Sequence, residues 1–415
     1  MAIELPVSPA WWEHDALLLR FVCDLVAGEL SILRRSRLEP TLPWSGTLHI
    51  GRDLGADSLE VLALATAFSE MLHLHRAGID DELLMRLQIQ DWIAVARQSL
   101  RQFSAELTFR TSGSGGSPKR CTHHLSSLWQ EVAFLATLLP GRRRILSVVP
   151  GHHIYGFLFT VLLPQAPGMG TLEVIDARGS SAARLAHQLR PGDLVVAHPE
   201  FWRAALQAQP TIPPDVIGVT SSAPCPDELA EALPAAGLDK LVQVYGSSET
   251  GGVGWRDAAL SPFYLFPYWR RVADDAAILE RALPDGAIAP HVIQDVLEWV
   301  DAETFRPTGR VDQAVQVGGI NVFPVQVAAA LREHPAVLDA SVRLMRADEG
   351  NRLKAFIVPR AAHADHGQLQ AQLAIWSRER FGSPQRPTAF SFGRQLPRQA
   401  NGKMADWIID TVLSL

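Results

Sequence analysis

The most restrictive stretch of this sequence is a run of Gly, Ser and Thr residues that a lysine closes. It reads Thr111-Ser112-Gly113-Ser114-Gly115-Gly116-Ser117-Pro118-Lys119. Hydroxyls, unhindered backbone N–H groups and one ammonium are suited to hold a polyanion, so the run predicts a phosphate-binding loop. A flexible linker would explain the glycines but not the Pro-Lys end. The run is not a Walker A loop, because Pro118 precedes the lysine and Arg120 follows it.

The composition limits the class of protein. The 415 residues are 47% hydrophobic and 20% charged, which allows a large core and two or three domains. A net charge of −6 argues against nucleic acid as a partner. The three cysteines lie far apart and form neither a zinc pattern nor a disulfide framework. The apolar run at 154–163 is too short to span a membrane, and acidic residues interrupt the N-terminus. We therefore expect a cytoplasmic protein without a membrane span.

The first 105 residues predict a helical region. Apolar residues recur at helical spacing in four stretches, Trp11–Leu30, Ser58–Leu74, Asp80–Leu87 and Asp91–Phe103. The second stretch begins within Leu54-Gly55-Ala56-Asp57-Ser58-Leu59, which resembles the attachment motif of an acyl carrier protein. That resemblance implies phosphopantetheine on Ser58. The same residues also suit an ordinary helix start, with Asp57 or Ser58 as the N-cap. In that second interpretation Leu59, Leu62 and Leu64 pack against the neighbouring domain.

Between residues 145 and 245, short β-branched runs alternate with helical stretches. This alternation predicts a parallel sheet covered by helices. Polar groups follow four of the expected strands, at 151–153, 198, 221–224 and 245–249. Because ligands bind outside the carboxyl ends of such strands, we expect these groups to meet in one crevice.

After residue 312 the pattern changes to a small α+β domain. Two strands flank a turn at 347–351, a helix follows near 368–381, and a last strand lies near Phe390. The expected organisation is therefore a helical region at 1–105, a large domain at 106–311 and a small domain at 312–415.

Four further motifs accompany the Gly/Ser loop in a fixed order. They are His153-Ile154-Tyr155-Gly156, Tyr245-Gly246-Ser247-Ser248-Glu249, Gly309-Arg310-Val311-Asp312, and Leu396-Pro397 through Gly402-Lys403. Together the five motifs resemble those of the adenylate-forming enzymes, which include acyl-CoA synthetases, peptide-synthetase adenylation domains and luciferases. The resemblance covers about residues 108–415. It implies an α/β fold whose large adenylating domain precedes a small mobile domain, and it implies ATP and Mg²⁺ as cofactors.

The resemblance also assigns the nucleotide site. The phosphates would lie against Thr111, Ser112, Gly113, Ser114, Gly115, Gly116 and Lys119. Mg²⁺ would bind Glu249 beside the Ser248 hydroxyl. The adenine would be bordered by Tyr245, Gly246, Ser222, Ala223 and Pro224. The family's Thr-Gly-Asp tripeptide for ribose is absent, but its usual interval before Gly309 leads to Asp295, and Arg310 would bind ribose or phosphate.

The remaining assignments concern the acid and the moving domain. The acyl pocket would be lined by His153, Tyr155, Gly156, Ser221 and Gly251. Lys403 would enter the crevice, where its charge stabilises oxygens that become more negative in the transition state. Asp312 would be the hinge. Gln316 and Gln326 stand where relatives often have Lys and Glu, so the tunnel for the incoming thiol departs from the family pattern.

The resemblance implies an ATP-dependent ligase that activates a carboxylic acid and transfers the acyl group to a phosphopantetheine thiol. The segment 245–255 and the short chain are most similar to ligases of xanthomonadin and aryl-polyene pigment pathways. In that group the acid would be an aryl acid such as 3-hydroxybenzoate, and the partner would be a holo-acyl carrier protein.

Two alternatives stay open. One is an acyl-CoA synthetase that uses free coenzyme A. The other is a non-catalytic carrier-binding scaffold, which the retained Lys119, Glu249, Asp295 and Lys403 disfavour. An acidic carrier would need a basic surface, for which the candidates are Arg332, Arg343, Arg346, Arg352 and Lys354.

Overall fold

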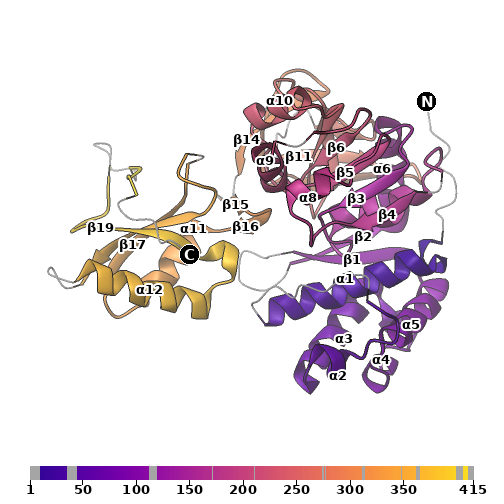
Figure 1. Ribbon diagram of the computed structural model, residues 1–415, viewed down its shortest axis with the longest axis horizontal. Coiled ribbons are helices and arrows are strands. Elements are labelled where there is room, and N and C mark those ends of the chain that lie inside the picture. The colour runs from indigo at the N-terminus through magenta and orange to yellow at the C-terminus, as the bar shows by residue number, and fades with distance from the viewer. Residues whose placement is uncertain are drawn as a thin grey trace. The chain divides into compact units, whose positions relative to one another are not determined.

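The computed structural model describes residues 10–34, 44–111, 119–170, 172–209, 211–272, 275, 277–310, 314–346, 348–360, 365–398 and 405–409. The described residues form two compact units, one up to Thr308 and one from Gly309 onward (Figure 1). Each unit has its own hydrophobic core. In the described part of the chain, no helix is long and apolar enough to cross a membrane.

The first unit begins with the expected helical region. Its helices are α1 (Asp15–Leu33), α2 (Ile50–Leu54), α3 (Ser58–Leu72), α4 (Glu82–Met85) and α5 (Ile89–Gln102). The short α2 was not expected. Asp57 is the N-cap of α3, and its carboxylate accepts from the Glu60 N–H at 2.8 Å within a complete capping box. Ser58 is therefore the first residue of the helix rather than its cap, and it is exposed.

A β-hairpin connects the helical region to the rest of the unit. Strands β1 (Glu106–Thr111) and β2 (Lys119–His124) pair antiparallel, so that Thr111 lies opposite Lys119 at the end that carries the Gly/Ser loop. In Figure 1 this hairpin lies between α1–α5 and the larger sheet. Helix α3 contacts β1, and α6 (Leu125–Leu138) contacts β2.

The large sheet has nine strands in the order β13-β14-β9-β8-β7-β6-β5-β3-β4. Its parallel half contains β3 (Arg144–Ser147), β4 (Glu173–Asp176), β5 (Asp193–Ala197), β6 (Ile217–Thr220) and β7 (Lys240–Ser247). Its antiparallel half contains β8 (Gly251–Arg256), β9 (Phe263–Leu265), β13 (Asp295–Trp299) and β14 (Thr304–Arg310). The expected parallel sheet is confirmed, and the antiparallel half extends it.

Helices cover both faces of the parallel strands. Along β5, Leu194 and Val196 belong to the core shared with α6, whereas Val195 and Ala197 belong to a second core beneath other helices. Those helices are α8 (Ala182–Ala186), α9 (Pro199–Gln207) and α10 (Asp227–Ala235). Burial on both faces explains why these strands are almost wholly apolar in sequence.

Three further strands and several short turns complete the first unit. Strands β10 (Trp269–Arg271), β11 (Ile278–Ala282) and β12 (Ile288–Val292) form an antiparallel sheet. Helix α7 (Ile154–Phe157), a π-helical segment at 158–162 and 3₁₀ turns at 11–13, 74–76 and 163–165 lie between the larger elements.

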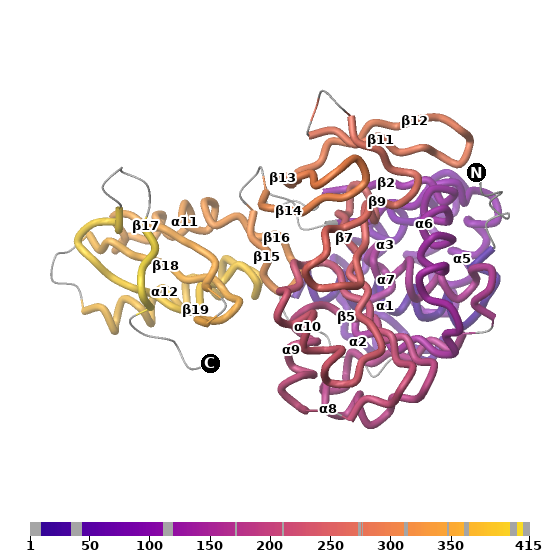
Figure 2. The backbone as a smooth tube through the Cα atoms, turned by 90° about the horizontal axis from the view of Figure 1, so that it is seen from above, coloured from indigo at the N-terminus to yellow at the C-terminus, as the bar shows by residue number. Residues whose placement is uncertain are grey.

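The second unit is the expected small α+β domain. Its elements are β15 (Val315–Val317), β16 (Ile320–Val322), α11 (Pro324–Arg332), β17 (Val337–Leu344), β18 (Leu353–Pro359), α12 (His366–Arg380), a 3₁₀ turn at 383–385 and β19 (Pro387–Phe392). The hairpin of β17 and β18 and the final strand occur where they were expected, and β19 pairs with β18 in parallel. Figure 2 shows the same elements along the backbone.

One expected basic surface residue is buried instead. The Lys354 side chain is 1% exposed, and its ammonium lies 2.8 Å from Glu349 and 2.9 Å from Asp406. Arg343 and Arg346 also pair with Asp406. The proposal that Lys354 belongs to a basic surface is therefore wrong, because carboxylates within the same unit neutralise it.

The helical region shares one hydrophobic core with the large sheet. The ring of Phe157 in α7 lies 5.2 Å from Trp11, 5.7 Å from Phe21 in α1 and 5.5 Å from Phe109 in β1, measured between centroids. In α3, Leu64 is buried as the packing interpretation requires, but Leu59 and Leu62 are 75% and 51% exposed. That part of the interpretation is wrong, since these two leucines face solvent.

We expect Phe157→Ala to loosen α1 as well as α7. Removing a buried phenylalanine costs about 3–5 kcal/mol, and here the cavity opens against Trp11 and Phe21. Hydrogen exchange of the α1 amides should accelerate. Phe390→Ala, which removes an equally buried ring from the second unit, is the matched control and should leave α1 protected. If α1 exchange stayed unchanged in Phe157→Ala, the helical region would be an independent module.

Candidate active site

Four polar segments follow neighbouring parallel strands at one edge of the sheet. Strands β3, β5, β6 and β7 lie side by side in that order, so their carboxyl ends share this edge. The segments that follow them are 151–153, His198, 221–224 and 247–249. The strands thus end at a common edge, and the meeting of their polar groups in one crevice stays a prediction.

Tyr245 and Asp295 meet at this edge although fifty positions separate them. The Tyr245 hydroxyl lies 2.6 Å from Oδ2 of Asp295. The tyrosine ring is half-buried and packs edge-on against Phe305, 5.2 Å between centroids. An aromatic face and a carboxylate are thus fixed next to each other, one from β7 and one from β13.

The segment after β6 borders the same place. The Ser221 hydroxyl donates to the backbone carbonyl of Val244 at 2.8 Å, which ties the segment to β7. Ser222 has φ +74°, in the left-handed region that favours glycine, and Ala223 and Pro224 follow it. Serine does not favour this backbone conformation by itself, and the hydrogen bond from Ser221 to β7 helps to hold it.

The turn between β7 and β8 carries Glu249. The Ser247 hydroxyl accepts from the N–H groups of Glu249 at 3.2 Å and Thr250 at 3.3 Å, which fixes the turn internally. Gly246 has no room for a side chain, because a Cβ would lie 2.2 Å from the Gly251 carbonyl oxygen. Gly251 has φ +69°, which also favours glycine.

Lys119 and Glu249 form an ion pair at 2.6 Å. Burial of Glu249 would raise its pKa, but the hydrogen bond and the charge of Lys119 outweigh that effect, so the pKa is lowered. The carboxylate is therefore ionised at neutral pH. Lys119, the last residue of the Gly/Ser run, thus contacts Glu249, the acid of the Tyr245–Glu249 motif.

The expected acyl-pocket residues are only partly open. His153 is the exposed N-cap residue of α7. Tyr155 is buried, and its hydroxyl donates to the Ala197 carbonyl at 2.9 Å. Gly156 packs so closely that a Cβ would lie 1.9 Å from the Pro150 carbonyl oxygen. Burial against the ends of β3 and β5 accounts for both Tyr155 and Gly156.

Several expected site residues lie outside the described residues or apart from this unit. Ser112, Gly113, Ser114, Gly115, Gly116, Asp312 and Lys403 are outside the described residues, as is the Thr111 side chain. Arg310 belongs to the second unit.

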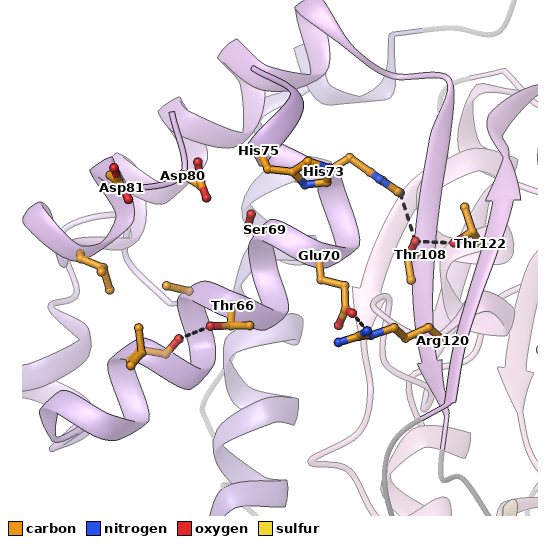
Figure 3. Close-up of a pocket in the computed structure, with 13 residues that line it drawn as sticks. Thr66, Ser69, Glu70, His73, His75, Asp80, Asp81, Thr108, Arg120 and Thr122 are labelled. Carbon is orange, nitrogen blue, oxygen red and sulfur yellow. Dashed lines mark hydrogen bonds and ion pairs between the residues drawn. The ribbon is translucent and has the colours of Figure 1, made fainter. Parts of the chain in front are cut away.

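The opposite face of strand β2 contacts the helical region. Side chains alternate along a strand, so Arg120 and Thr122 face away from Lys119 and His123. Arg120 and Arg110 both pair with Glu70 of α3, and the Thr108 hydroxyl lies 2.8 Å from that of Thr122. Glu70, Arg120 and the two threonines border a hollow of about 510 Å³ between α3, the segment before α4 and the hairpin (Figure 3).

Three buried residues near the Glu249 turn were not expected from the sequence. His123 of β2, Glu131 of α6 and Arg281 of β11 each contact the backbone of residues 248–252. The period of two along β2 could have indicated His123, because it lies on the same face as Lys119. No comparable signal marks the other two, which lie 150 positions apart in the chain.

We expect Glu70→Ala to loosen the hairpin. Glu70 is 16% exposed and pairs with two arginines, and charged hydrogen bonds of this kind contribute about 1.5–3 kcal/mol. Amide exchange in β1 and β2 should accelerate by roughly ten- to hundredfold. Glu60→Ala is the control, since it breaks an ion pair with Arg34 elsewhere on α3. Equal exchange in both variants would contradict a role for Glu70 in holding the hairpin.

Comparisons with known proteins agree with these motifs. A family model described as AMP-binding enzyme matches residues 105–275, and one described as AMP-binding enzyme C-terminal domain matches residues 326–403. A protein of Rhodobacter capsulatus named 4-coumarate–CoA ligase is 40% identical over 383 residues, covering 90% of this chain and 95% of that protein. A protein of the same name from Halorhodospira halophila is 38% identical over 392 residues, covering 93% and 97%.

Solved structures share the fold at low identity. An amide bond synthetase from Marinactinospora thermotolerans is 16% identical with a TM-score of 0.60, over 93% of this chain and 92% of that one. A malonyl-CoA ligase is 20% identical with a TM-score of 0.56, over 70% and 71%. With identity at 37–40% to relatives covered over 84–97% of their length, and with both domain matches in order, the chain belongs to the AMP-binding enzyme family of adenylate-forming enzymes and is an AMP-forming acid–thiol ligase.

Proposed function

We propose that this ligase uses ATP and Mg²⁺ to adenylate an aryl acid and then transfers the acyl group to a phosphopantetheine thiol. The observation that supports this most directly is the contact between Lys119 and Glu249 at 2.6 Å. It lies at the sheet edge that also holds Tyr245 and Asp295. In this proposal Lys119 and Glu249 serve the phosphates and their metal ion. The ring of Tyr245 and the carboxylate of Asp295 serve the nucleoside.

The chemistry requires these groups together. A carboxylate oxygen attacks the α-phosphorus of ATP, the bond to the β-phosphate oxygen breaks, and pyrophosphate leaves. Charge must be neutralised and the reacting groups held in line. Lys119 would bind the outgoing phosphates with the Gly/Ser loop, and Lys403 would stabilise the α-phosphate and the carboxylate. Tyr245 would pack on adenine while Asp295 accepts from the ribose hydroxyls.

The donors at Glu249 fit Mg²⁺. Mg²⁺ prefers oxygen ligands and usually takes one or two carboxylates together with substrate phosphates. Glu249 is ionised, and the Ser248 hydroxyl is adjacent. Among the described residues, no group of three or more His, Cys, Asp and Glu could hold a metal by itself. When bound, the ion would neutralise phosphate charge as the leaving group departs.

The sequence resemblance and the names of the relatives favour different acids and different acceptor thiols. The sequence resemblance favours 3-hydroxybenzoate and a carrier protein, whereas three relatives at 37–40% identity are named 4-coumarate–CoA ligase. Both acids carry a hydroxyphenyl ring, with the carboxylate on the ring in one and joined through a double bond in the other, so a phenolic acid is the shared class. Coenzyme A and a carrier present the same phosphopantetheine thiol, and the relatives' names favour coenzyme A.

We expect ATP–pyrophosphate exchange to be fastest with aryl acids in a panel that contains 3-hydroxybenzoate, 4-coumarate and fatty acids. Lys403→Ala should reduce exchange by hundreds-fold, since losing contacts to transition-state charge costs about 3–4 kcal/mol. Arg394→Ala, an exposed cation in the same unit, is the control. Exchange at the wild-type rate in Lys403→Ala would refute its role, and no exchange with any acid would favour the scaffold.

Ser58 in the helical region is the candidate for a second acceptor within the chain. Ser58 is exposed at the start of α3, beside the exposed Leu59 and Leu62. Against attachment at Ser58 stands the shared core with the large sheet. A match that covers 93% of this chain also includes most of residues 1–105, and that relative is named as a CoA ligase.

We therefore expect no mass change when the protein is co-expressed with a phosphopantetheinyl transferase and measured intact. Ser58→Ala should then transfer the acyl group to a separate thiol as fast as wild type does. A mass increase of one phosphopantetheine that disappears in Ser58→Ala but persists in Ser69→Ala would contradict this and establish a carrier module. Turnover with coenzyme A and with holo-carrier, compared in the same assay, identifies the acceptor.

A further inference from the structure

The turn that carries Glu249 is held by more than its own hydrogen bonds. Ser247 and Thr250 already close the turn internally. In addition, three backbone groups between residues 248 and 252 each bond a buried side chain from a different element. These side chains are His123, Glu131 and Arg281.

Arg281 ties the end of the turn to α6. Its side chain is 2% exposed, and its guanidinium donates to the Ser127 carbonyl at 2.6 Å and to the Thr250 carbonyl at 3.3 Å. The guanidinium carbon lies 4.7 Å from the ring centroid of Tyr268 and 5.6 Å from that of Trp269. The cation is therefore fixed on several sides and holds the Thr250 peptide in place.

Glu131 lies against the backbone just after the turn. It is 1% exposed, and its Oε1 accepts from the Gly252 N–H at 2.8 Å. A Cβ at Gly251 or Gly252 would lie 2.6 or 2.5 Å from a Glu131 oxygen, so only glycine allows this approach. Burial raises the pKa of Glu131 to about 7, although the charge of Arg281 and the Gly252 hydrogen bond oppose that rise.

His123 holds the peptide that precedes Glu249. Its Nε2 lies 2.7 Å from the Ser248 carbonyl oxygen, which can only accept, so Nε2–H donates. Burial lowers the pKa of His123 to about 4, so the ring is neutral at physiological pH. Lys119 precedes His123 by four residues and lies on the same face of β2. Strand β2 thus carries one partner of the ion pair, Lys119, and through His123 it contacts the peptide before the other partner, Glu249.

Burying a carboxylate and a guanidinium is costly, and well-packed apolar residues would serve stability as well or better. The contacts of His123, Glu131 and Arg281 instead converge on one turn. Such contacts can hold the backbone of that turn in a fixed position. We propose that His123, Glu131 and Arg281 are positioning residues that orient the Glu249 carboxylate toward the nucleotide-bound divalent cation. This inference rests on the proposed function, in which Glu249 binds Mg²⁺.

The test measures how much Mg²⁺ tightens ATP binding, by calorimetry with Mg²⁺ and with EDTA in the absence of acid substrate. His123→Leu should bind metal-free ATP as tightly as wild type does. The increase in ATP affinity that Mg²⁺ produces, called the gain from here on, should be about tenfold smaller in this variant. His123→Gln can donate to the same carbonyl and should recover most of that gain. Thr122→Val changes the neighbouring residue on the opposite face of β2 and should match wild type.

Arg281→Lys is the second variant, since it keeps the charge beside Glu131 but cannot bridge Ser127 and Thr250. We expect it to lose part of the Mg²⁺ gain, which keeps the test decisive if His123→Leu does not fold. If Glu249→Gln removes the gain while His123→Leu and Arg281→Lys keep it, the positioning role is refuted and the proposed function stands. If Glu249→Gln itself keeps the gain, the metal role of Glu249 and this inference both fail.

Discussion

Strand β2 is held on both of its faces, and the candidate site depends on that arrangement. One face contacts the helical region through Arg120 and Glu70. The other face contacts the turn after β7 through Lys119 and His123. Because Thr111 pairs with Lys119 across the hairpin, fixing β2 also fixes both ends of the Gly/Ser loop. A loop rich in glycine needs such anchors, since its own backbone loses much conformational freedom on ordering.

This arrangement gives the helical region a structural role that does not require it to be a carrier. Residues before 105 supply Glu70 to the hairpin and Trp11 and Phe21 to the aromatic cluster around Phe157. The exposed Ser58, Leu59 and Leu62 lie on a part of α3 that these contacts do not use. Different parts of α3 thus support the β1–β2 hairpin and present an exposed surface.

Much of the fold could be predicted from the sequence because its signals are local. Alternating apolar runs located β5, β6 and β7, and the hydrophobic period located α3 and α5. The resemblance also implied Asp295, through the family's usual interval before Gly309, and in the structure Asp295 contacts Tyr245. These features depend on residues close in sequence or on a known interval.

The features that could not be predicted depend on partners far apart in the chain. Lys354 looked like a surface cation, but it is buried because Asp406 and the Trp407 carbonyl reach it from more than fifty positions away. Glu131 and Arg281 reveal their roles only when α6 and β11 are packed on the same turn. Tyr155 fits an expected pocket motif, yet its hydroxyl bonds the end of β5.

Adenylation requires that a carboxylate oxygen attack the α-phosphorus of ATP at this site. The most direct measurement supplies an aryl acid labelled with ¹⁸O in its carboxylate, together with ATP and coenzyme A, and determines where the label goes. An acyl-adenylate intermediate predicts that each turnover leaves one ¹⁸O atom in AMP, because the bond between carbonyl carbon and bridging oxygen breaks on thiol attack. Label in inorganic phosphate or pyrophosphate, with none in AMP, would contradict adenylation.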